Sequence, residues 1–301
     1  MKEKFLRAID VCSGGGGWAV AARGLPIRID YVFDKEIDCL LTYKENHPHV
    51  EPICCDIVEY DFSRLAGKVD LILGGIPCEQ ISMARNGTPL SEGEEEKLHL
   101  LIDKCCALPE QLGARWWCYE DVIQIIPKLP IFTEYFVLSS EHYSAQKRIR
   151  AFVSNIPCPR KGRSNKKVLQ DCLLPGPYRR SMAINKKTPG RSTGFYSTDT
   201  FYPWYPEDKS PTVVSGISRH DYYMAVEYAT SCFRQLEWQE AAKLQGFPED
   251  YLFIGSLSRV MKQIGQAVQI DTARAILKSL CRAAGLMKKD GKVVEAGEIH
   301  I

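Results

Sequence analysis

The sequence predicts an α/β protein with a mostly parallel, doubly wound sheet and a smaller, irregular second domain. Short apolar runs typical of buried parallel strands alternate with helical stretches through the first part of the chain. The first run leads into a glycine-rich turn. The composition changes at Pro157, after which Pro, Gly, Ser and Thr are frequent. We therefore expect residues 1–156 and 256–301 to form the main domain and residues 157–255 to form the second.

The bulk composition is that of an ordinary globular protein. The 301 residues are 45% hydrophobic and 25% charged, and the formal net charge of +2 identifies no class of partner. The twelve cysteines include the pairs Cys54-Cys55 and Cys105-Cys106, but none shows the CxxC spacing of a zinc site. We expect free thiols in a reducing cytoplasm, no bound metal and no membrane-spanning segment.

The first unit has the order strand, glycine turn, helix. The apolar run from Phe5 to Val11 contains Asp10 and leads into the turn Cys12–Gly17, and a helical stretch runs from Ala19 to Arg23. Glycines let the backbone approach a ligand at the start of a helix, so this order is typical of nucleotide-type binding units. Glycine-rich turns are common, and the turn alone is a weak signal.

The next two strands also end at carboxylates. The run Ile29–Phe33 precedes Asp34, which suits a ribose diol and is equally compatible with capping the helix Glu36–Asn46. A third strand, Glu51–Cys55, precedes Asp56. Because parallel strands share one carboxyl edge, these side chains are expected to gather there.

A candidate nucleophile follows the fourth strand. The apolar run from Val69 to Leu73 is expected to stop at Gly74-Gly75, and Pro77 then fixes a turn that carries the thiol of Cys78. A rigid turn can fix the direction of nucleophilic attack. The alternative is that Cys78 is a small buried hydrophobe, as most cysteines are.

A polar segment separates this turn from the fifth strand. Residues 83–99 are expected to begin as a loop and to enter a helix that ends at Leu112. A long loop after a candidate nucleophile is often a lid, although a plain solvated connection fits nearly as well. The strand Arg115–Tyr119 then ends at Glu120.

The remaining elements are a hairpin and C-terminal helices. Strands Glu134–Ser140 and Arg148–Ile156 are predicted to pair, with Arg148 and Arg150 on one face. Arg234–Leu244 is predicted to be a helix closed by Gly246 and a following proline, and Ser258–Leu280 has helical spacing.

A basic segment lies in the predicted second domain. Its cations are Arg160, Lys161, Arg163, Lys166, Lys167, Arg179, Arg180, Lys186, Lys187 and Arg191. Aromatic residues, including Phe195, Tyr196 and Trp204, follow. Cations that neutralise phosphates beside aromatics that stack on bases indicate a nucleic-acid surface. The alternative is a solvated face of the protein.

Taken together, these motifs resemble those of the DNA cytosine-5 methyltransferases, in order and spacing, from the first strand to the helix near Leu280. The matching stretches are Asp10–Gly17, Asp34, Asp56-Ile57, Pro77-Cys78, Glu120-Asp121-Val122, Gln146-x-Arg148-x-Arg150, Pro211-Thr212-Val213, the segment Arg234–Pro248, and Ile264–Val268. The resemblance implies a class I, Rossmann-like fold that uses S-adenosylmethionine.

The resemblance also implies the roles of individual residues. The catalytic set is Cys78, Glu120, Arg148 and Arg150. The residues implied to bind S-adenosylmethionine are Asp10, Cys12, Gly14, Gly15, Gly17, Asp34, Lys35, Asp56, Ile57, Pro77, Gln266 and Val268. Those implied to contact double-stranded DNA are Ser82, Arg85, Gln146, Arg163, Lys166, Arg179, Arg180 and Arg191. We expect a monomeric prokaryotic or phage-encoded enzyme, and the short recognition region predicts a target of about two to four base pairs.

Several positions depart from the family pattern. Glu79, Asp121 and Gln266 stand where Gln, Asn and Asn are usual, and Cys12 and Lys35 replace residues that are commonly aromatic. The last two departures concern the contacts to adenine. The extra carboxylates near the nucleophile are expected to raise the pKa of the thiol or of Glu120 by like-charge repulsion. Rival functions are methylation of RNA or a free nucleotide, transfer of an altered group, and catalytically silent DNA binding.

Overall fold

The computed structural model describes residues 5–76, 90–161, 165–175, 181–182, 205–214, 225–229, 232–288 and 290–294. Its main sheet has the strand order β3-β2-β1-β4-β5-β7-β6. The strands are β1 (Leu6–Val11), β2 (Ile27–Asp34), β3 (Glu51–Cys54), β4 (Leu71–Gly75), β5 (Trp116–Asp121), β6 (Tyr135–Ser139) and β7 (Ile149–Ser154). The first five are parallel, and β7 runs antiparallel to both neighbours. The predicted mostly parallel sheet and its terminal hairpin are confirmed.

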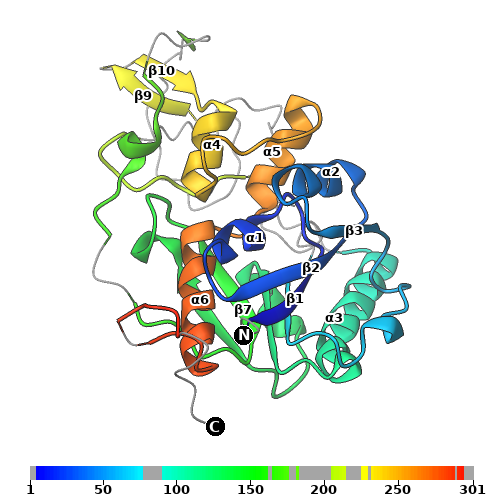
Figure 1. The fold of residues 1–301 in the computed structure, drawn as a ribbon. Helices are drawn as coiled ribbons and strands as arrows, with labels where there is room; N and C mark the ends of the chain where they lie inside the picture. Colours follow the sequence, from blue (N-terminus) through cyan, green and yellow to red (C-terminus); the bar gives the residue numbers. More distant parts are fainter. Residues whose placement is uncertain are drawn as a thin grey trace.

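Helices cover both faces of this sheet (Figure 1). Helices α1 (Gly17–Ala22), α2 (Ile37–Asn46) and α6 (Ile270–Ala283) share one apolar core with Ala8 of β1. Helix α3 (Glu92–Leu112) shares the opposite core with Ile9. Successive side chains of a strand point to opposite faces, so the apolar run of β4 serves both cores, with Leu71 and Leu73 in the first and Ile72 in the second.

Helix α3 shows how local sequence sets an element. Ser91 and Glu94 form a capping box at its start, and Gly113 ends it in the left-handed conformation with φ of 66°. Apart from the adjacent pair Leu108-Pro109, its buried side chains follow one another at intervals of three or four residues: Leu98, Ile102, Cys105, Leu108, Pro109 and Leu112. This stripe packs against the sheet, and the predicted helix ending at Leu112 is confirmed.

A second, antiparallel sheet has the order β8-β10-β9, with β8 at Ser181–Met182, β9 at Ala225–Ala229 and β10 at Cys232–Gln235. Figure 1 shows β9 and β10 at one end of the molecule, with α4 (Trp238–Gln245) on the side nearer α1. Helix α5 (Leu257–Gln266) packs on α4. Short 3₁₀ helices occupy Ser63–Leu65, Ile123–Lys128, Ser140–His142 and Leu169–Cys172.

Two helix predictions need correction. Arg234 lies in β10 and not in a helix, because the helix begins only at Trp238, after a capping box formed by Glu237 and Glu240. The helical pattern Ser258–Leu280 is divided into α5 and α6. Gln269 starts α6 by accepting a hydrogen bond from the backbone N–H of Thr272.

The end of β4 also differs from the prediction. Strand β4 includes Gly74 and Gly75 as its last two residues, so it ends two positions later than predicted. A Cβ atom at Gly74 would lie 2.4 Å from the backbone oxygen of Val11 on the adjacent strand. Glycine is therefore needed here for close approach of backbones and not for a turn.

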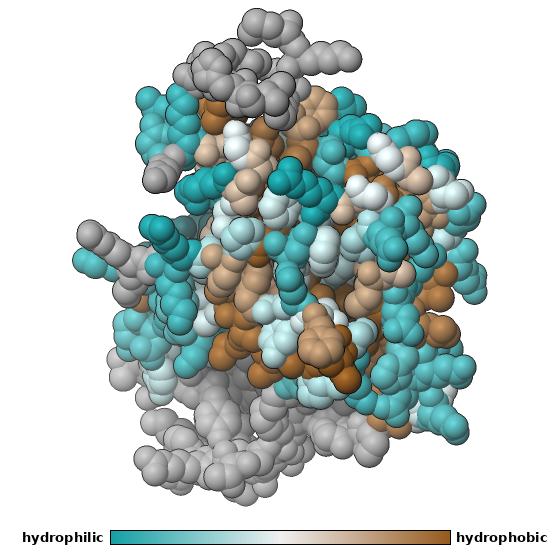
Figure 2. All heavy atoms as spheres, turned by 90° about the horizontal axis from the view of Figure 1, so that it is seen from below, coloured by the Kyte–Doolittle hydropathy of each residue, from teal (hydrophilic) through white to brown (hydrophobic). Residues whose placement is uncertain are grey.

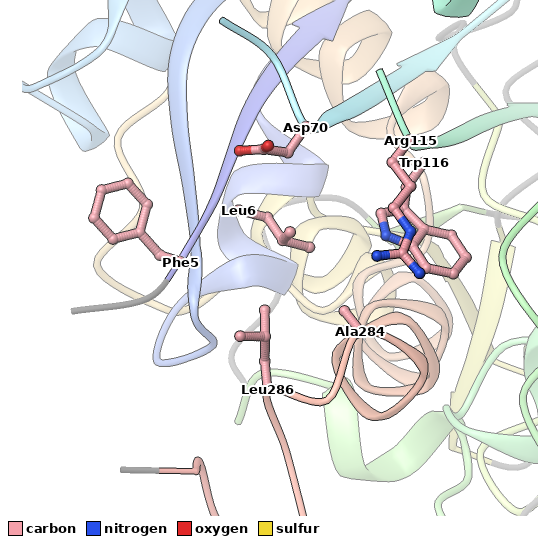
Figure 3. A pocket seen from close by; sticks show the side chains of 7 residues that line it. All are labelled: Phe5, Leu6, Asp70, Arg115, Trp116, Ala284 and Leu286. Atoms are coloured by element: carbon pink, nitrogen blue, oxygen red, sulfur yellow. The ribbon is translucent and has the colours of Figure 1, made fainter. Parts of the chain in front are cut away.

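The amino-terminal edge of the sheet carries a pocket of about 220 Å³. Its lining residues are Phe5, Leu6, Asp70, Arg115, Trp116, Ala284 and Leu286 (Figure 3). In the view from below, apolar side chains gather near the middle of the face with polar ones around them (Figure 2). The pocket lies at the opposite ends of the strands from Asp34 and Glu120. Among the described helices, none is long and apolar enough to cross a membrane.

Candidate active site

Three features that the sequence predicts, the glycine turn, Asp34 and Glu120, lie at the carboxyl edge of the main sheet. Strands β1, β2, β4 and β5 are adjacent and parallel, so their ends meet. Val11 pairs with Phe33 on one side and Gly74 on the other, and Gly75 pairs with Glu120. The glycine turn, Asp34 and Glu120 therefore lie along one edge, as expected for a ligand site in an open α/β sheet.

Asp34 ties the glycine turn to the start of α2. Its Oδ2 accepts the backbone N–H of Gly14 at 2.8 Å, and its Oδ1 accepts that of Glu36 at 2.9 Å. Burial raises the pKa of Asp34, and these two hydrogen bonds oppose that shift. The helix N-cap is Glu36 and not Asp34, although Asp34 does satisfy an N–H at that end. Binding of a ribose by Asp34 stays a prediction.

Asp10 lies behind the turn and not at its surface. Its side chain is fully buried, and Oδ2 accepts the hydroxyl of Tyr43 at 3.1 Å. Burial raises the pKa of Asp10 well above its ordinary value, with Asp34 adding to the shift. We interpret Asp10 as a support of the turn, so its predicted contact with a cofactor would have to be indirect.

The positions expected to face an adenine are not aromatic. Cys12 is half-buried and adopts a φ of 49°, while Lys35 is exposed. Asp56 is exposed, with Oδ1 accepting the N–H of Val58 at 2.9 Å, and Ile57 is buried. These placements leave the predicted roles of all four residues open.

The C-terminal segment packs against the glycine turn. A Cβ atom at Gly17 would lie 3.0 Å from Cγ1 of Val268, so the last motif returns to the first, as the sequence predicts. The hydroxyl of Tyr251 donates to the carbonyl of Gly15 at 2.6 Å, and a Cβ atom at Gly15 would lie 3.1 Å from Oε1 of Gln263. Sequence reasoning missed Tyr251 and Gln263, because nothing local links them to the turn.

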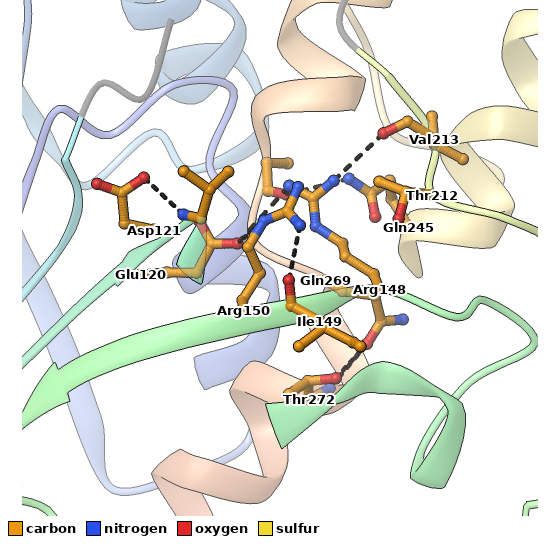
Figure 4. A network of polar contacts seen from close by, with 12 residues as sticks. Glu120, Asp121, Arg148, Ile149, Arg150, Thr212, Val213, Gln245, Gln269 and Thr272 are labelled. Carbon is orange, nitrogen blue, oxygen red and sulfur yellow. Dashed lines mark hydrogen bonds and ion pairs between the residues drawn. The ribbon is translucent and has the colours of Figure 1, made fainter. Parts of the chain in front are cut away.

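Glu120 is held by two arginines (Figure 4). Its Oε1 lies 3.2 Å from Nε of Arg150 and 3.6 Å from Nη2 of Arg148. The Glu120 side chain is 8% exposed, so both ion pairs are largely shielded from water. Arg148 and Arg150 meet one carboxylate, which confirms that they share a face.

The two arginines differ in their surroundings. Arg148 is 3% exposed, and its guanidinium also donates to the carbonyls of Val213 at 3.2 Å and Ala267 at 3.3 Å. It thereby joins three distant parts of the chain. Arg150 is 15% exposed and donates to the carbonyl of Ile149. Arg150 is thus the more open cation beside Glu120, and the predicted action of Arg148 on the thiol stays a prediction.

The side chain of Gln146 is fully buried. Its Nε2 donates to Oε1 of Gln245 at 3.0 Å, and its Oε1 accepts the N–H of Val213 at 3.3 Å. Gln245 in turn donates to the carbonyls of Ile264 and Ala267. Gln146 therefore anchors the Pro211–Val213 segment. A contact between Gln146 and DNA stays a prediction.

Asp121, next to Glu120, is a buried carboxyl. Its Oδ1 accepts the N–H of Val122 at 2.6 Å, and Oδ2 has no hydrogen-bond partner among the described residues. Burial, and then the charge of Glu120, raise the pKa of Asp121 well above its ordinary value. The like-charge effect expected near the nucleophile is thus found on Asp121 itself.

Several predicted residues lie outside the described ranges. They are Pro77, Cys78, Glu79, Ser82 and Arg85 after β4, and Arg163, Arg179, Arg180 and Arg191 in the predicted second domain. The described chain leads to Ile76, whose N–H donates to the carbonyl of Glu120 at 3.2 Å. Lys166 is exposed, and Gln266 is half-buried at the end of α5. No group of metal-binding side chains occurs among the described residues.

Comparisons with known proteins agree with this arrangement. Among curated proteins, the type II methyltransferase M.PspPI of Psychrobacter sp. is 25% identical over 350 residues, covering 94% of this chain and 80% of the relative. M.DsaV of Dactylococcopsis salina is 22% identical, covering 99% and 93%. A putative DNA modification methyltransferase encoded in an E. coli prophage matches with a TM-score of 0.65 at 18% identity, covering 93% of this chain and 99% of that one.

The S. pombe Dnmt2 methyltransferase matches with a TM-score of 0.66 at 14% identity, covering 93% and 99%. These neighbours share the mostly parallel sheet of class I methyltransferases, and at such identities they show the fold alone. The family model of C-5 cytosine-specific DNA methylases matches residues 6–109 and 134–282. The chain belongs to the C-5 cytosine-specific DNA methylase family, and its relatives identify it as a DNA (cytosine-5-)-methyltransferase.

Proposed function

We propose that the protein methylates carbon 5 of cytosine in duplex DNA, using S-adenosylmethionine and a covalent adduct between Cys78 and carbon 6 of a flipped base. One observation carries the proposal. Glu120, paired with Arg148 and Arg150, stands beside Gly75 at the end of the strand that leads to Cys78. A carboxylate at one strand end, and a thiol that follows three residues after the end of the neighbouring strand, would be able to act on one pyrimidine ring.

The chemistry requires both groups. Carbon 5 of cytosine is a poor nucleophile until a thiolate adds at carbon 6 and moves an electron pair toward carbon 5. That electron pair at carbon 5 would then form the new bond to the methyl group, while the sulfur–methyl bond of S-adenosylmethionine breaks and its electrons stay on sulfur, leaving S-adenosylhomocysteine. A base then removes the proton of carbon 5, and the bond between carbon 6 and Cys78 breaks to release the product.

Glu120 is proposed to hold ring nitrogen 3 and the exocyclic amine as the thiol adds. Proton transfer at nitrogen 3 prevents negative charge from building on the ring, and such general acid help contributes about 10²–10⁴ in rate. Arg150, the more open cation, lies within reach of the same carboxylate and would orient it. A cysteine thiol has a pKa of about 8.5, so nearby positive charge also favours the reactive thiolate.

The residues present fit the cofactor in part. At Gly14 an added Cβ would meet no atom within 4 Å, so the turn is open there. Asp34, which accepts a hydrogen bond from the backbone N–H of Gly14, is the proposed ribose ligand. Gly17 and Val268 close the other side of the turn. Contacts to adenine through Cys12, Lys35, Asp56 and Ile57 remain part of the proposal.

The DNA substrate and the division of the chain are proposed together. The relatives M.PspPI and M.DsaV are type II methyltransferases, which favours a modification enzyme of a restriction system. We propose that residues 157–255 recognise DNA, that the remaining residues carry catalysis, and that the enzyme acts as a cytoplasmic monomer. Flipping a base costs a few kcal/mol, which phosphate contacts by a basic domain can offset.

The test uses methyl-labelled S-adenosylmethionine with duplex DNA, RNA or deoxycytidine monophosphate, followed by digestion to nucleosides and mass spectrometry. We expect labelled 5-methylcytosine from DNA alone. Cys78→Ala should abolish it, and Cys158→Ala, at an exposed thiol, should not. Product from RNA or the mononucleotide alone would overturn the proposed substrate.

A further inference from the structure

Tyr251 makes a long-range contact with the glycine turn. Its hydroxyl donates to the carbonyl oxygen of Gly15 at 2.6 Å, across 236 positions of sequence. Tyr251 is 4% exposed, and burial raises its pKa, so the hydroxyl keeps its proton and remains a donor. The contact fixes the direction in which this carbonyl points.

The ring of Tyr251 cannot shift easily. It packs against Phe247 and Phe253, with ring centroids 4.8 and 5.2 Å away. On the turn side, a Cβ atom at Gly16 would lie 2.5 Å from the Tyr251 hydroxyl. The hydroxyl therefore occupies the space that a side chain at Gly16 would need, and turn and tyrosine fit each other as a unit.

The order of strands indicates which part of the cofactor this turn would face. Strand β1 lies between β2, which carries Asp34, and β4, which leads toward Cys78. If Asp34 on β2 holds the ribose and the methyl group is directed to β4, the amino-acid end of S-adenosylmethionine would lie over the turn after β1. A carbonyl oxygen pointing toward that end would repel its carboxylate.

We propose that Tyr251 is a positioning residue for the amino-acid end of S-adenosylmethionine, because it holds the Gly15 carbonyl in the protein core. The carbonyl oxygen of Gly15 then does not face the carboxylate of S-adenosylmethionine, so it does not repel that carboxylate. This inference rests on the proposed function and adds a residue that does not itself contact the cofactor.

The binding of two ligands distinguishes a positioning role of Tyr251 from a role in packing alone. S-Adenosylhomocysteine carries the amino-acid end, whereas 5′-methylthioadenosine has the same adenosine and lacks it. Calorimetric titration of the full chain would compare wild type, Tyr251→Phe and the control Tyr143→Phe. Tyr143 also donates its hydroxyl to a backbone carbonyl, that of Arg160 at 3.3 Å, but far along the chain from the turn.

We expect Tyr251→Phe to weaken S-adenosylhomocysteine by about 5- to 100-fold, as for a lost buried hydrogen bond, and 5′-methylthioadenosine by less than about twofold. Tyr143→Phe should leave both affinities unchanged. In steady-state assays, Tyr251→Phe should raise KM for S-adenosylmethionine while kcat stays within about threefold. Gly16→Ala, which displaces the same hydroxyl, should show the same selectivity.

Equal weakening of both ligands by Tyr251→Phe, or no weakening, would overturn the inference while leaving the proposed function intact. If the wild type bound neither ligand, the proposed function itself would fail. A Tyr251→Phe protein that does not fold is recognised by circular dichroism, and the selectivity of Gly16→Ala then decides the question.

Discussion

Glu120 on β5 is the register partner of Gly75 on β4, and its carbonyl accepts the N–H of the next residue, Ile76, at 3.2 Å. This pairing places the carboxylate at the side of the strand that leads to Cys78. The negative charge of Glu120 is paired with Arg150 on β7 and with Arg148, which lies just before β7. The candidate site is therefore organised by sheet register, and its geometry depends on backbone pairing as much as on side chains.

Replacing the ionisable carboxyl group of Glu120 should reduce methyl transfer strongly. Glu120→Gln keeps the shape but cannot supply a proton to nitrogen 3, so we expect kcat to fall by about 10²–10⁴. Single-turnover kinetics with labelled cofactor would measure this. The control is Glu134→Gln, at an exposed carboxylate just before β6, which should retain full activity. A rate for Glu120→Gln within threefold of wild type would contradict the assigned role.

Arg148→Lys should destabilise the fold more than Arg150→Lys does. A lysine at position 148 cannot serve Glu120 and the carbonyls of Val213 and Ala267 together. Each buried carbonyl left unsatisfied costs about 1–3 kcal/mol, so we expect a loss of about 2–4 kcal/mol in the free energy of unfolding. Urea unfolding of both variants measures the difference. Equal losses in the free energy of unfolding of the two variants would show that Arg148 does not hold these three parts of the chain together.

Asp121→Asn should change how stability depends on pH. The pKa of Asp121 is raised in the folded state, so its stabilising effect is complete below the unfolded value of about 3.9 and is lost as pH rises toward the folded pKa. The amide has no such dependence. We expect Asp121→Asn to melt at a higher temperature than wild type at pH 7 and to lose that advantage near pH 4. A difference that is constant with pH would contradict a neutral buried Asp121.

Two glycine substitutions should act in opposite directions. Gly74→Ala places a Cβ atom 2.4 Å from the carbonyl oxygen of Val11, so β1 and β4 must separate. We expect a loss of several kcal/mol or failure to fold. Gly93→Ala, in the first turn of α3 with nothing within 4 Å, should be neutral or stabilising by up to about 1 kcal/mol. Thermal melting of both variants tests the comparison.

The sequence was most informative where local pattern determines structure. Apolar runs located the strands of the main sheet, and the helix ending at Leu112 was also predicted. Arg234 was misplaced because the short strand β10 is fixed by pairing with β8 and β9, and four residues are too few to show a strong period of their own. The role expected for Gln146 came from the family resemblance, whereas its partners Val213 and Gln245 become visible only once the chain is folded. The contact between Tyr251 and the glycine turn was missed for the same reason, because it joins residues far apart in the sequence.

The covalent adduct is the most direct test of the proposed mechanism. Duplex DNA containing 5-fluorocytosine at target sites cannot lose a proton from carbon 5 after methylation, so the bond from Cys78 to carbon 6 should persist. With S-adenosylmethionine present, we predict a stable protein–DNA complex whose digestion yields a modified peptide containing Cys78, and no complex with Cys78→Ala. Formation of 5-methylcytosine in unmodified DNA without any adduct on the fluorinated duplex would contradict the account.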